Sequence, residues 1–118
     1  MKITKFEDVI AWQKAREFNI ELHKHFCDSK DYSFKDQILR AGLSINNNIA
    51  EGFERATNKE LSYFLVVARG SNSEVRSMLY SALDFGYISH SQHQMLTESS
   101  IVIGKLLTGF IKSIKTIK

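Results

Sequence analysis

Among the carboxylates of this 118-residue chain, Glu51 has the most unusual sequence surroundings. It lies in a run of nine residues, Ser44–Gly52, in which three asparagines, a serine and Glu51 itself interrupt an apolar helical pattern. A glutamate in such a place can act as a general acid or base. That chemistry needs a second acid, a histidine or a metal, and no such partner accompanies Glu51 in the sequence. We therefore interpret the run as structural and predict no catalytic residue.

The spacing of the polar side chains supports the structural interpretation. Residues four, three and four apart share one face of a helix, and a later helix offers guanidinium and amide groups around one of its turns. The predicted structural polar network comprises Ser44, Asn48, Glu51, Arg55, Arg69 and Asn72. We expect it to be buried and satisfied, because such networks fix the register of helices more than they add stability. Gly52 and Gly70, inside the same helices, are expected to permit close helix packing.

Histidine and cysteine side chains raise the question of a metal site. His23, His25 and Cys27 follow one another at two-residue steps, which places His25 on a different helix face from the other two. His90 and His93 form a second pair in which a third ligand is missing. Two ligands do not make a metal site, so we predict surface histidines, no metal and no cofactor.

Four helices must position these residues, and apolar residues at three- and four-residue steps define them. The expected helices span about residues 6–27, 34–55, 57–86 and 90–116 in a single domain of residues 1–118. Capping boxes at Thr57–Glu60 and Ser89–Gln92 begin the last two helices, and Gly86 ends the third. Because the connections are short, we predict an all-α, antiparallel up-down-up-down four-helix bundle.

The third and fourth helices carry more apolar residues than one bundle core needs. The surplus consists of Phe64, Val67, Met78 and Phe85 on the third helix and Val102, Leu106 and Ile111 on the fourth. Scattered, half-exposed apolar residues are common in proteins. The surplus is contiguous, however, and favours a homo-oligomer that buries it.

Composition narrows the class of protein. Hydrophobic residues make up 43% and charged residues 25%, as in a globular protein. The single cysteine excludes an intrachain disulfide, the N-terminal residues do not form a signal peptide, and no apolar run is long enough to cross a membrane. We therefore expect a cytoplasmic protein that does not interact with membranes.

The net charge of +3 is concentrated in the last helix. Residues 1–98 hold 12 basic and 13 acidic residues, whereas residues 99–118 hold four lysines and no acid. These lysines are Lys105, Lys112, Lys115 and Lys118. Repeated around an oligomer, they would provide salt-dependent contacts to the phosphates of RNA or DNA. The alternative is a solvated helix face whose cations are favourable near the C-terminus.

The chain resembles the four-helix bundle family of the bacterial 23S rRNA intervening-sequence proteins. The matching segments are Phe6-Glu7-Asp8, Trp12-Gln13-Lys14-Ala15, the Ser-Ile-x-x-Asn-Ile-Ala-Glu-Gly signature at residues 44–52, Asn58-Lys59-Glu60 before Phe64-Leu65, the Ala-x-Gly-Ser-x-x-Glu run at residues 68–74, and Asp84 with Gly86-Tyr87-Ile88. Two segments depart from the family: Asn46-Asn47 replaces a usual Pro-Ser, and Phe53-Glu54-Arg55 is less basic than usual. The resemblance implies a homo-oligomer, a ring of five bundles. It also extends to accessory proteins of diversity-generating retroelements, which contact nucleic acid and a reverse transcriptase.

The sequence therefore predicts an oligomeric, non-enzymatic helical bundle that associates with nucleic acid or serves as a scaffold. An adaptor for a protein partner without nucleic-acid contact is the alternative from the interaction class. A ribonuclease is the alternative from the enzyme class, because Arg16 and His23 match the loose Arg-x(4–6)-His pattern of HEPN-type ribonucleases. A motif this short arises easily by chance.

Overall fold

Four α-helices make up nearly all of the computed structural model, which describes residues 3–116 and the side chains of residues 3–114. The helices are α1 (Ile10–Phe26), α2 (Tyr32–Phe53), α3 (Asn58–Asp84) and α4 (His90–Thr116), and a short 3-10 turn, η1 (Phe6–Asp8), precedes them. The described part of the chain contains no strand. The predicted all-α fold with four helices is confirmed.

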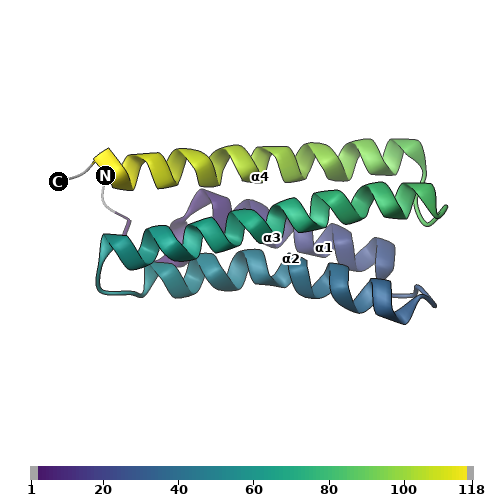
Figure 1. The fold of residues 1–118 in the computed structure, drawn as a ribbon, viewed down its shortest axis with the longest axis horizontal. Helices are drawn as coiled ribbons and strands as arrows, with labels where there is room; N and C mark the ends of the chain where they lie inside the picture. The colour runs from purple at the N-terminus through teal and green to yellow at the C-terminus, as the bar shows by residue number, and fades with distance from the viewer. Residues whose placement is uncertain (1–2, 117–118) are drawn as a thin grey trace.

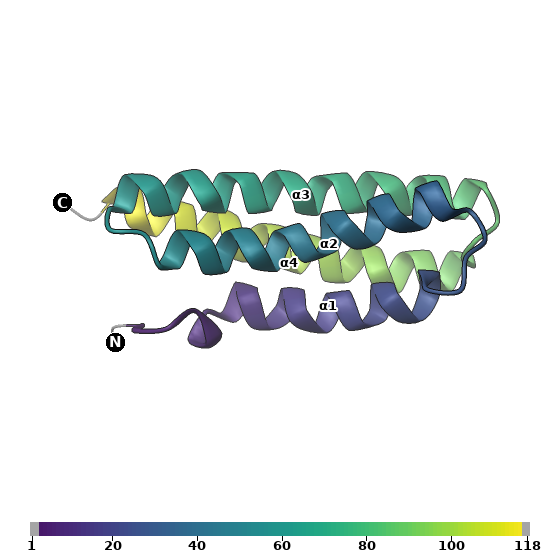
Figure 2. The ribbon, with the colours of Figure 1, turned by 90° about the horizontal axis from the view of Figure 1, so that it is seen from below.

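The helices lie side by side along the long axis of the molecule, which measures 48 Å against 22 and 19 Å across (Figures 1 and 2). After each helix the chain turns back, so the start of α1 and the end of α4 lie toward the same end of the molecule (Figure 1). Each helix packs against two others, in the order α1, α2, α3, α4 and back to α1. A groove lies on the outside between each pair of neighbouring helices.

The predicted starts of the first two helices are wrong, and the local structure before each helix explains both. The first helix begins at Ile10 rather than at residue 6, because Phe6–Asp8 forms a separate turn and Val9 has extended backbone angles. The second helix begins at Tyr32, two residues earlier than expected. Asp31 caps it, since its carboxylate accepts a hydrogen bond from the backbone N–H of Phe34 at 3.2 Å.

Both predicted capping boxes form hydrogen bonds. Ser89 and Gln92 bond reciprocally, side chain to backbone N–H, at 3.1 and 2.8 Å. Thr57 accepts from the N–H of Glu60, while its hydroxyl group donates to the Glu60 carboxylate. Gly86 follows α3 with a φ angle of +79°, a left-handed conformation that glycine adopts without a steric penalty.

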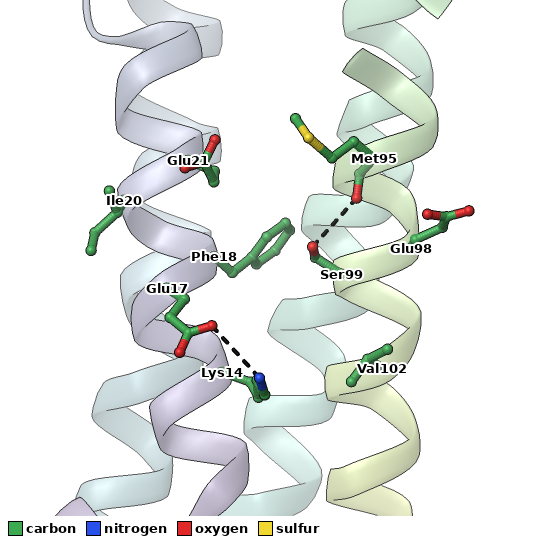
Figure 3. A pocket seen from close by; sticks show the side chains of 9 residues that line it. All are labelled: Lys14, Glu17, Phe18, Ile20, Glu21, Met95, Glu98, Ser99 and Val102. Carbon is green, nitrogen blue, oxygen red and sulfur yellow. Dashed lines mark hydrogen bonds and ion pairs between the residues drawn. The ribbon is translucent and has the colours of Figure 1, made fainter. Parts of the chain in front are cut away.

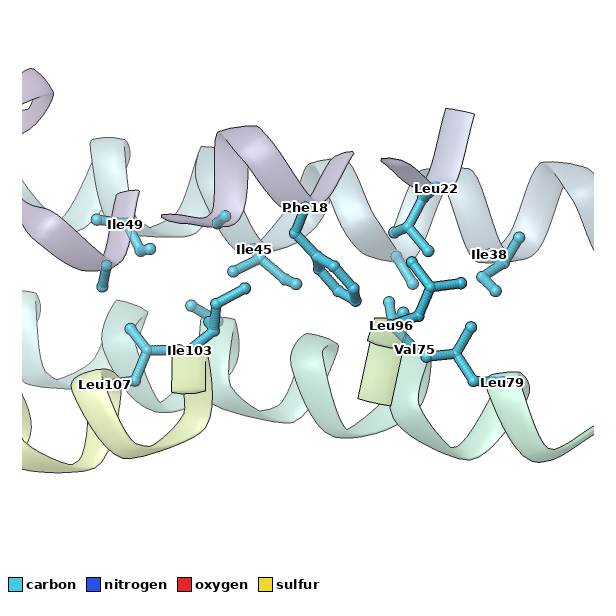
Figure 4. Close-up of a cluster of buried hydrophobic side chains, with 14 of the residues drawn as sticks. Phe18, Leu22, Ile38, Ile45, Ile49, Val75, Leu79, Leu96, Ile103 and Leu107 are labelled. Atoms are coloured by element: carbon cyan, nitrogen blue, oxygen red, sulfur yellow. The ribbon is translucent and has the colours of Figure 1, made fainter. Parts of the chain in front are cut away.

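Apolar side chains from all four helices meet along the axis of the bundle (Figure 4). The largest that are fully buried are Phe18, Leu22 and Phe26 of α1, Ile38, Ile45 and Ile49 of α2, Leu65, Val75 and Leu79 of α3, and Leu96, Ile103 and Leu107 of α4. They recur at three- and four-residue steps, so each helix turns one continuous stripe inward. Every buried side-chain nitrogen or oxygen among the described residues has a hydrogen-bond partner.

The surplus apolar residues are divided between the core and the surface. Ile111 is buried, Phe64, Val67, Met78 and Leu106 are half-buried, and Phe85 and Val102 are exposed.

The two mid-helix glycines have different surroundings. At Gly52 an added Cβ would come within 2.7 Å of Phe64 Cβ. Gly52 therefore permits the predicted close packing of α2 on α3. At Gly70 an added Cβ would meet no other atom within 4 Å, so within one chain its predicted packing role is wrong.

Candidate nucleic-acid interface

The first part of the Ser44–Gly52 run joins α2 to α3. Ser44 lies 2.9 Å from Ser71 of α3, hydroxyl to hydroxyl. The Asn48 amide donates to both the carbonyl oxygen and the hydroxyl group of Ser44, at 2.8 and 2.9 Å. All three side chains are half-buried. This small cluster fixes the register of the two helices, as the spacing on α2 predicts.

Glu51 and Arg55 do not join that cluster. Both are exposed, and they form an ion pair with each other on the outside of α2. The Arg55 guanidinium also lies 4.8 Å from the centre of the Phe64 ring. The expectation of one buried network that includes Glu51 is therefore wrong within the single chain. An exposed pair four residues apart on a helix is worth only a few tenths of a kcal/mol, roughly 0.3–0.5.

Asn72 belongs to a different helix pair, because it joins α3 to α4. Its amide donates to the backbone carbonyl of Ser100 at 2.9 Å and accepts from the Ser100 hydroxyl at 3.0 Å. Asn72 is only 2% exposed and Ser100 is completely buried. Arg69 also joins α3 to α4, because its guanidinium donates to the Thr108 hydroxyl at 3.4 Å. Sequence reasoning missed Ser100 and Thr108 as partners, although Ser100 interrupts the apolar stripe of its helix and a polar residue there requires a partner.

A groove between α3 and α4 brings four cations together. Arg69 and Arg76 of α3 and Lys105 and Lys112 of α4 line it, together with Ser73 and Thr108. None of the lining residues is acidic. Within the described residues, none of the four cations lies within ion-pair distance of a carboxylate. The structure thus places two of the predicted lysines beside two arginines that the charge count alone did not connect to them.

The other two lysines cannot be placed in this groove. Lys118 lies outside the described residues, and the Lys115 side chain is also beyond those that the structure describes. The groove is therefore defined by Arg69, Arg76, Lys105 and Lys112, and we call it the basic groove. Its cations are arranged on two helices around the hydroxyl groups of Ser73 and Thr108, a chemistry that fits phosphate oxygens.

A second groove, between α1 and α4, has the opposite charge (Figure 3). Glu17 and Glu21 of α1 and Glu98 of α4 line it, and Lys14 is paired with Glu17 at 3.8 Å. Its apolar lining includes Ile20, Met95 and Val102, which are 51%, 47% and 48% exposed. We call it the acidic groove. Helix α4 thus separates an acidic, partly apolar groove from the basic groove.

A third groove, between α1 and α2, contains the residues of the ribonuclease pattern. Arg16 and His23 both line it, but no hydrogen bond joins the two side chains. Beneath them Asn19 donates to Asn46 Oδ1 at 2.6 Å, and Asn46 donates to the backbone carbonyl of Trp12 at 3.0 Å. Asn46, one of the departures from the family pattern, is thus a buried link between α1 and α2.

Two of the histidines contact groups other than a possible metal ligand. His25 bonds to the backbone oxygen of Glu21 at 2.8 Å, and His93 lies against the Tyr80 ring with 4.6 Å between ring centres. No three His, Cys, Asp or Glu side chains gather as metal ligands in the described part of the chain. None of its helices has the length and apolar character that a membrane span requires.

Among the described residues, the ionisable groups with shifted pKa values are Asp31 and Tyr87, which contact each other. The Tyr87 hydroxyl donates to the Asp31 carboxylate at 2.6 Å, across the loops that precede α2 and follow α3. This hydrogen bond, with the one from the Phe34 N–H, lowers the pKa of Asp31. The same bond raises the pKa of Tyr87. Both groups are remote from the basic groove and serve the fold.

Comparison with known proteins agrees with the sequence motifs and the fold. The family described as "23S rRNA-intervening sequence protein" matches residues 7–109. A 1.70 Å crystal structure of a protein of unknown function from the S23 ribosomal protein family of Bacteroides thetaiotaomicron is similar, with a TM-score of 0.81 and 27% identity over 86% of this chain and 98% of that one. No match was found among curated proteins. The chain belongs to the family of 23S rRNA-intervening sequence proteins.

Proposed function

We propose that the protein is a non-enzymatic, oligomeric bundle that binds the phosphate backbone of RNA or DNA through the basic groove. One observation carries the proposal: four cations from two helices line this groove without any acidic neighbour. Cations left unneutralised by the protein attract phosphates and release their counterions. The family's description, which refers to 23S rRNA, is consistent with a nucleic-acid partner.

Self-association is the second part of the proposal. Apolar residues remain exposed on the outer face of α3, where Tyr63, Val66 and Tyr80 are 64%, 42% and 54% exposed. On α4, Val102 is also exposed. Contact between copies would bury these side chains. A ring of five such bundles, which the family resemblance implies, would repeat the basic groove once per subunit; we place this antiparallel bundle in the cytoplasm.

RNA binding at several salt concentrations tests the groove. The double variant Arg76→Gln/Lys105→Gln removes two of the four positive charges of the basic groove. The matched control Lys30→Gln/Lys59→Gln removes two exposed lysines that have no ion-pair partner among the described residues. Fluorescence anisotropy with a mixed-sequence single-stranded RNA should show weaker binding for the groove variant. The dependence of log K on log salt should become shallower by about 1.4, about 0.7 for each lost phosphate contact.

The control variant should keep the salt dependence of the wild type. Equal losses in both variants would mean that net charge, and not the basic groove, governs binding. Light scattering on the same samples tests self-association. A protein with the mass of one chain that does not bind RNA would contradict both parts of the proposal.

A protein-partner adaptor remains a second candidate because of the acidic groove. Its carboxylates, Glu17, Glu21 and Glu98, surround exposed apolar side chains. An amphipathic helix with basic residues fits such a groove. Capture of a basic partner by the wild type, and its loss in Glu21→Gln/Glu98→Gln without loss of RNA binding, would support this function.

A further inference from the structure

The groove between α1 and α2 has a different composition from the two that flank α4. Its lining is mostly apolar and includes Trp12, Ile20 and Leu43. Ile20 and Leu43 leave 51% and 55% of their surface exposed, although a bundle helix normally presents polar residues there. The groove is therefore an apolar surface that the core of the single chain does not use.

Polar groups stand on both sides of this apolar surface. The α1 side carries the Arg16 guanidinium and the His23 imidazole, and the α2 side carries the Asn47 amide. Lys24 also lines the groove, but its ammonium group pairs with Glu21 at 3.5 Å. None of the lining residues is acidic. Arg16 has no carboxylate within ion-pair distance in the described part of the chain, and its guanidinium instead lies 5.9 Å from the centre of the Trp12 ring.

At the bottom of the groove the polar side chains already have hydrogen-bond partners. Asn19 and Asn46 use their amides on each other and on backbone carbonyls of both helices. The Phe6 ring supports Trp12 edge-on, with 5.2 Å between ring centres.

Arg16, His23 and Asn47 are the polar groups that remain for a ligand. All three are exposed, and no hydrogen bond occupies their side chains among the described residues. The groove thus offers a cation, an imidazole and an amide beside an apolar wall.

We propose that this groove binds an unpaired nucleobase, with the phosphate of the same nucleotide at Arg16. A nucleotide presents a polar base edge, an apolar face and an anion, and the groove offers an amide, an apolar wall and a cation. Single-stranded nucleic acids are recognised in this way, by packing of unstacked bases on apolar or aromatic side chains and hydrogen bonds to their edges. The absence of acids favours an anionic ligand, and a purely aliphatic anion leaves the Asn47 amide unused.

The inference rests on the proposed function, because the basic groove would hold the backbone of the same strand. The two grooves lie on opposite sides of the bundle, whose cross-section measures 22 by 19 Å. A strand of about twelve nucleotides, at about 3.4 Å each, spans about 40 Å and can pass around half of this section. The consequence is a preference for single strands, since a duplex offers no free base to the α1/α2 groove.

The chain's one tryptophan makes the experiment specific, because Trp12 lines the proposed base site. A mixed-sequence RNA of about twelve nucleotides and a duplex of the same length are titrated into the full-length protein. Anisotropy of a labelled strand measures total binding, and Trp12 emission measures contact with the base. We expect the single strand to quench Trp12 at saturation and the duplex to leave its emission unchanged.

Two variants separate base binding from backbone binding. Arg16→Gln should weaken single-strand binding by about tenfold, the loss of one charge-assisted hydrogen bond. Arg40→Gln, which removes an exposed arginine of α2 outside the groove, should bind like the wild type. Leu43→Ser should reduce the quenching while the duplex still binds. Far-ultraviolet circular dichroism confirms that each variant remains helical.

Each alternative outcome has a distinct meaning. Binding by anisotropy without quenching of Trp12 overturns the base site and leaves the proposed function intact. Equal quenching by single strand and duplex also overturns it. Trp12 emission that changes with protein concentration in the absence of RNA would show that a second copy fills the groove instead. If neither RNA binds, both the proposed function and this inference fail.

Discussion

At the scale of single residues, amide and hydroxyl side chains link neighbouring helices at positions that an apolar residue would otherwise occupy. Asn72 and Ser100 exchange two hydrogen bonds between α3 and α4. Asn46 joins α2 to α1 through Asn19 and the Trp12 carbonyl. A buried polar group is costly when its partner is lost. These links therefore specify the pairing of helices more than they raise stability.

Removal of Asn72 tests this view. Asn72→Ala should lower the free energy of unfolding by about 2 kcal/mol, because the buried Ser100 hydroxyl loses its partner. The double variant Asn72→Ala/Ser100→Ala should lose less than the sum of the two single variants. Urea denaturation measures all three. Ser73→Ala, an exposed neighbour, is the control, and additive losses would mean that the two side chains are not coupled.

The two mid-helix glycines should respond in opposite directions to the same change. Gly52→Ala introduces a methyl group 2.7 Å from Phe64 Cβ and should destabilise the fold. Overpacking of this kind costs about 1–3 kcal/mol. Gly70→Ala meets nothing within 4 Å and should gain about 0.5–1 kcal/mol from helix propensity. Thermal denaturation of both variants decides this, and a destabilised Gly70→Ala would point to a contact between copies.

At the scale of elements, the loops determine where helices begin and how the loop before α2 contacts the loop after α3. Asp31 caps α2, and its carboxylate also accepts from Tyr87, which follows α3. The Asp31 side chain therefore caps α2 and also anchors the loop that follows α3. Loss of an N-cap destabilises a helix, and here the cap also positions the aromatic cluster of Phe34, Phe85 and Tyr87.

The Asp31–Tyr87 bond predicts a specific pH dependence. The folded state lowers the pKa of Asp31, so its contribution to stability is present above the ordinary aspartate range and is lost as the pH falls below about 4. The pKa of Tyr87 is raised, so its contribution is present below about pH 10 and is lost as the pH rises further.

Urea midpoints across these two pH ranges measure the effect. Asp31→Asn should be less stable than the wild type at neutral pH and should lose less stability in acid. Tyr87→Phe should remove part of the alkaline loss. Asp36→Asn, an exposed aspartate without a hydrogen-bond partner among the described residues, serves as control. Identical acid profiles for Asp31→Asn and the wild type would contradict the assignment.

At the scale of the whole molecule, the charge of the chain is divided between faces. The basic groove and the acidic groove lie on the two sides of α4. A helix with its side chains is about 10–12 Å across, which is comparable to the Debye length of about 10 Å at 0.1 M salt. The acidic groove should therefore weaken RNA binding at the basic groove when the salt concentration is low.

Neutralising the acidic groove tests this repulsion. Glu21→Gln/Glu98→Gln should bind RNA about two- to threefold more tightly than the wild type at about 0.05 M salt, and equally at about 0.5 M, where screening is short-ranged. The control Asp36→Asn/Glu54→Gln also removes two negative charges, one from α2 and one from the residue that follows it. It should have a smaller effect on RNA binding. A gain that persists at high salt would exclude a long-range electrostatic cause.

Much of the fold was accessible from the sequence, because each helix has a continuous apolar stripe and recognisable caps. The core positions of α2 and α3 and the Ser89–Gln92 box follow from local spacing. The start of α1 could not be predicted from local spacing, because Phe6–Asp8 continues the apolar spacing but forms a separate turn. Local patterns determine which residues turn inward and leave the exact helix ends to tertiary contacts.

The sequence by itself determined that the chain forms four amphipathic helices and that its net positive charge lies in the last one. Only the tertiary structure decided which polar groups meet. It separated Glu51 from Asn72, paired Asn72 with Ser100, and placed Arg69 and Arg76 beside Lys105 and Lys112. The reason is physical: the period of a helix assigns a residue to a face, whereas the neighbour of that face depends on how whole helices pack.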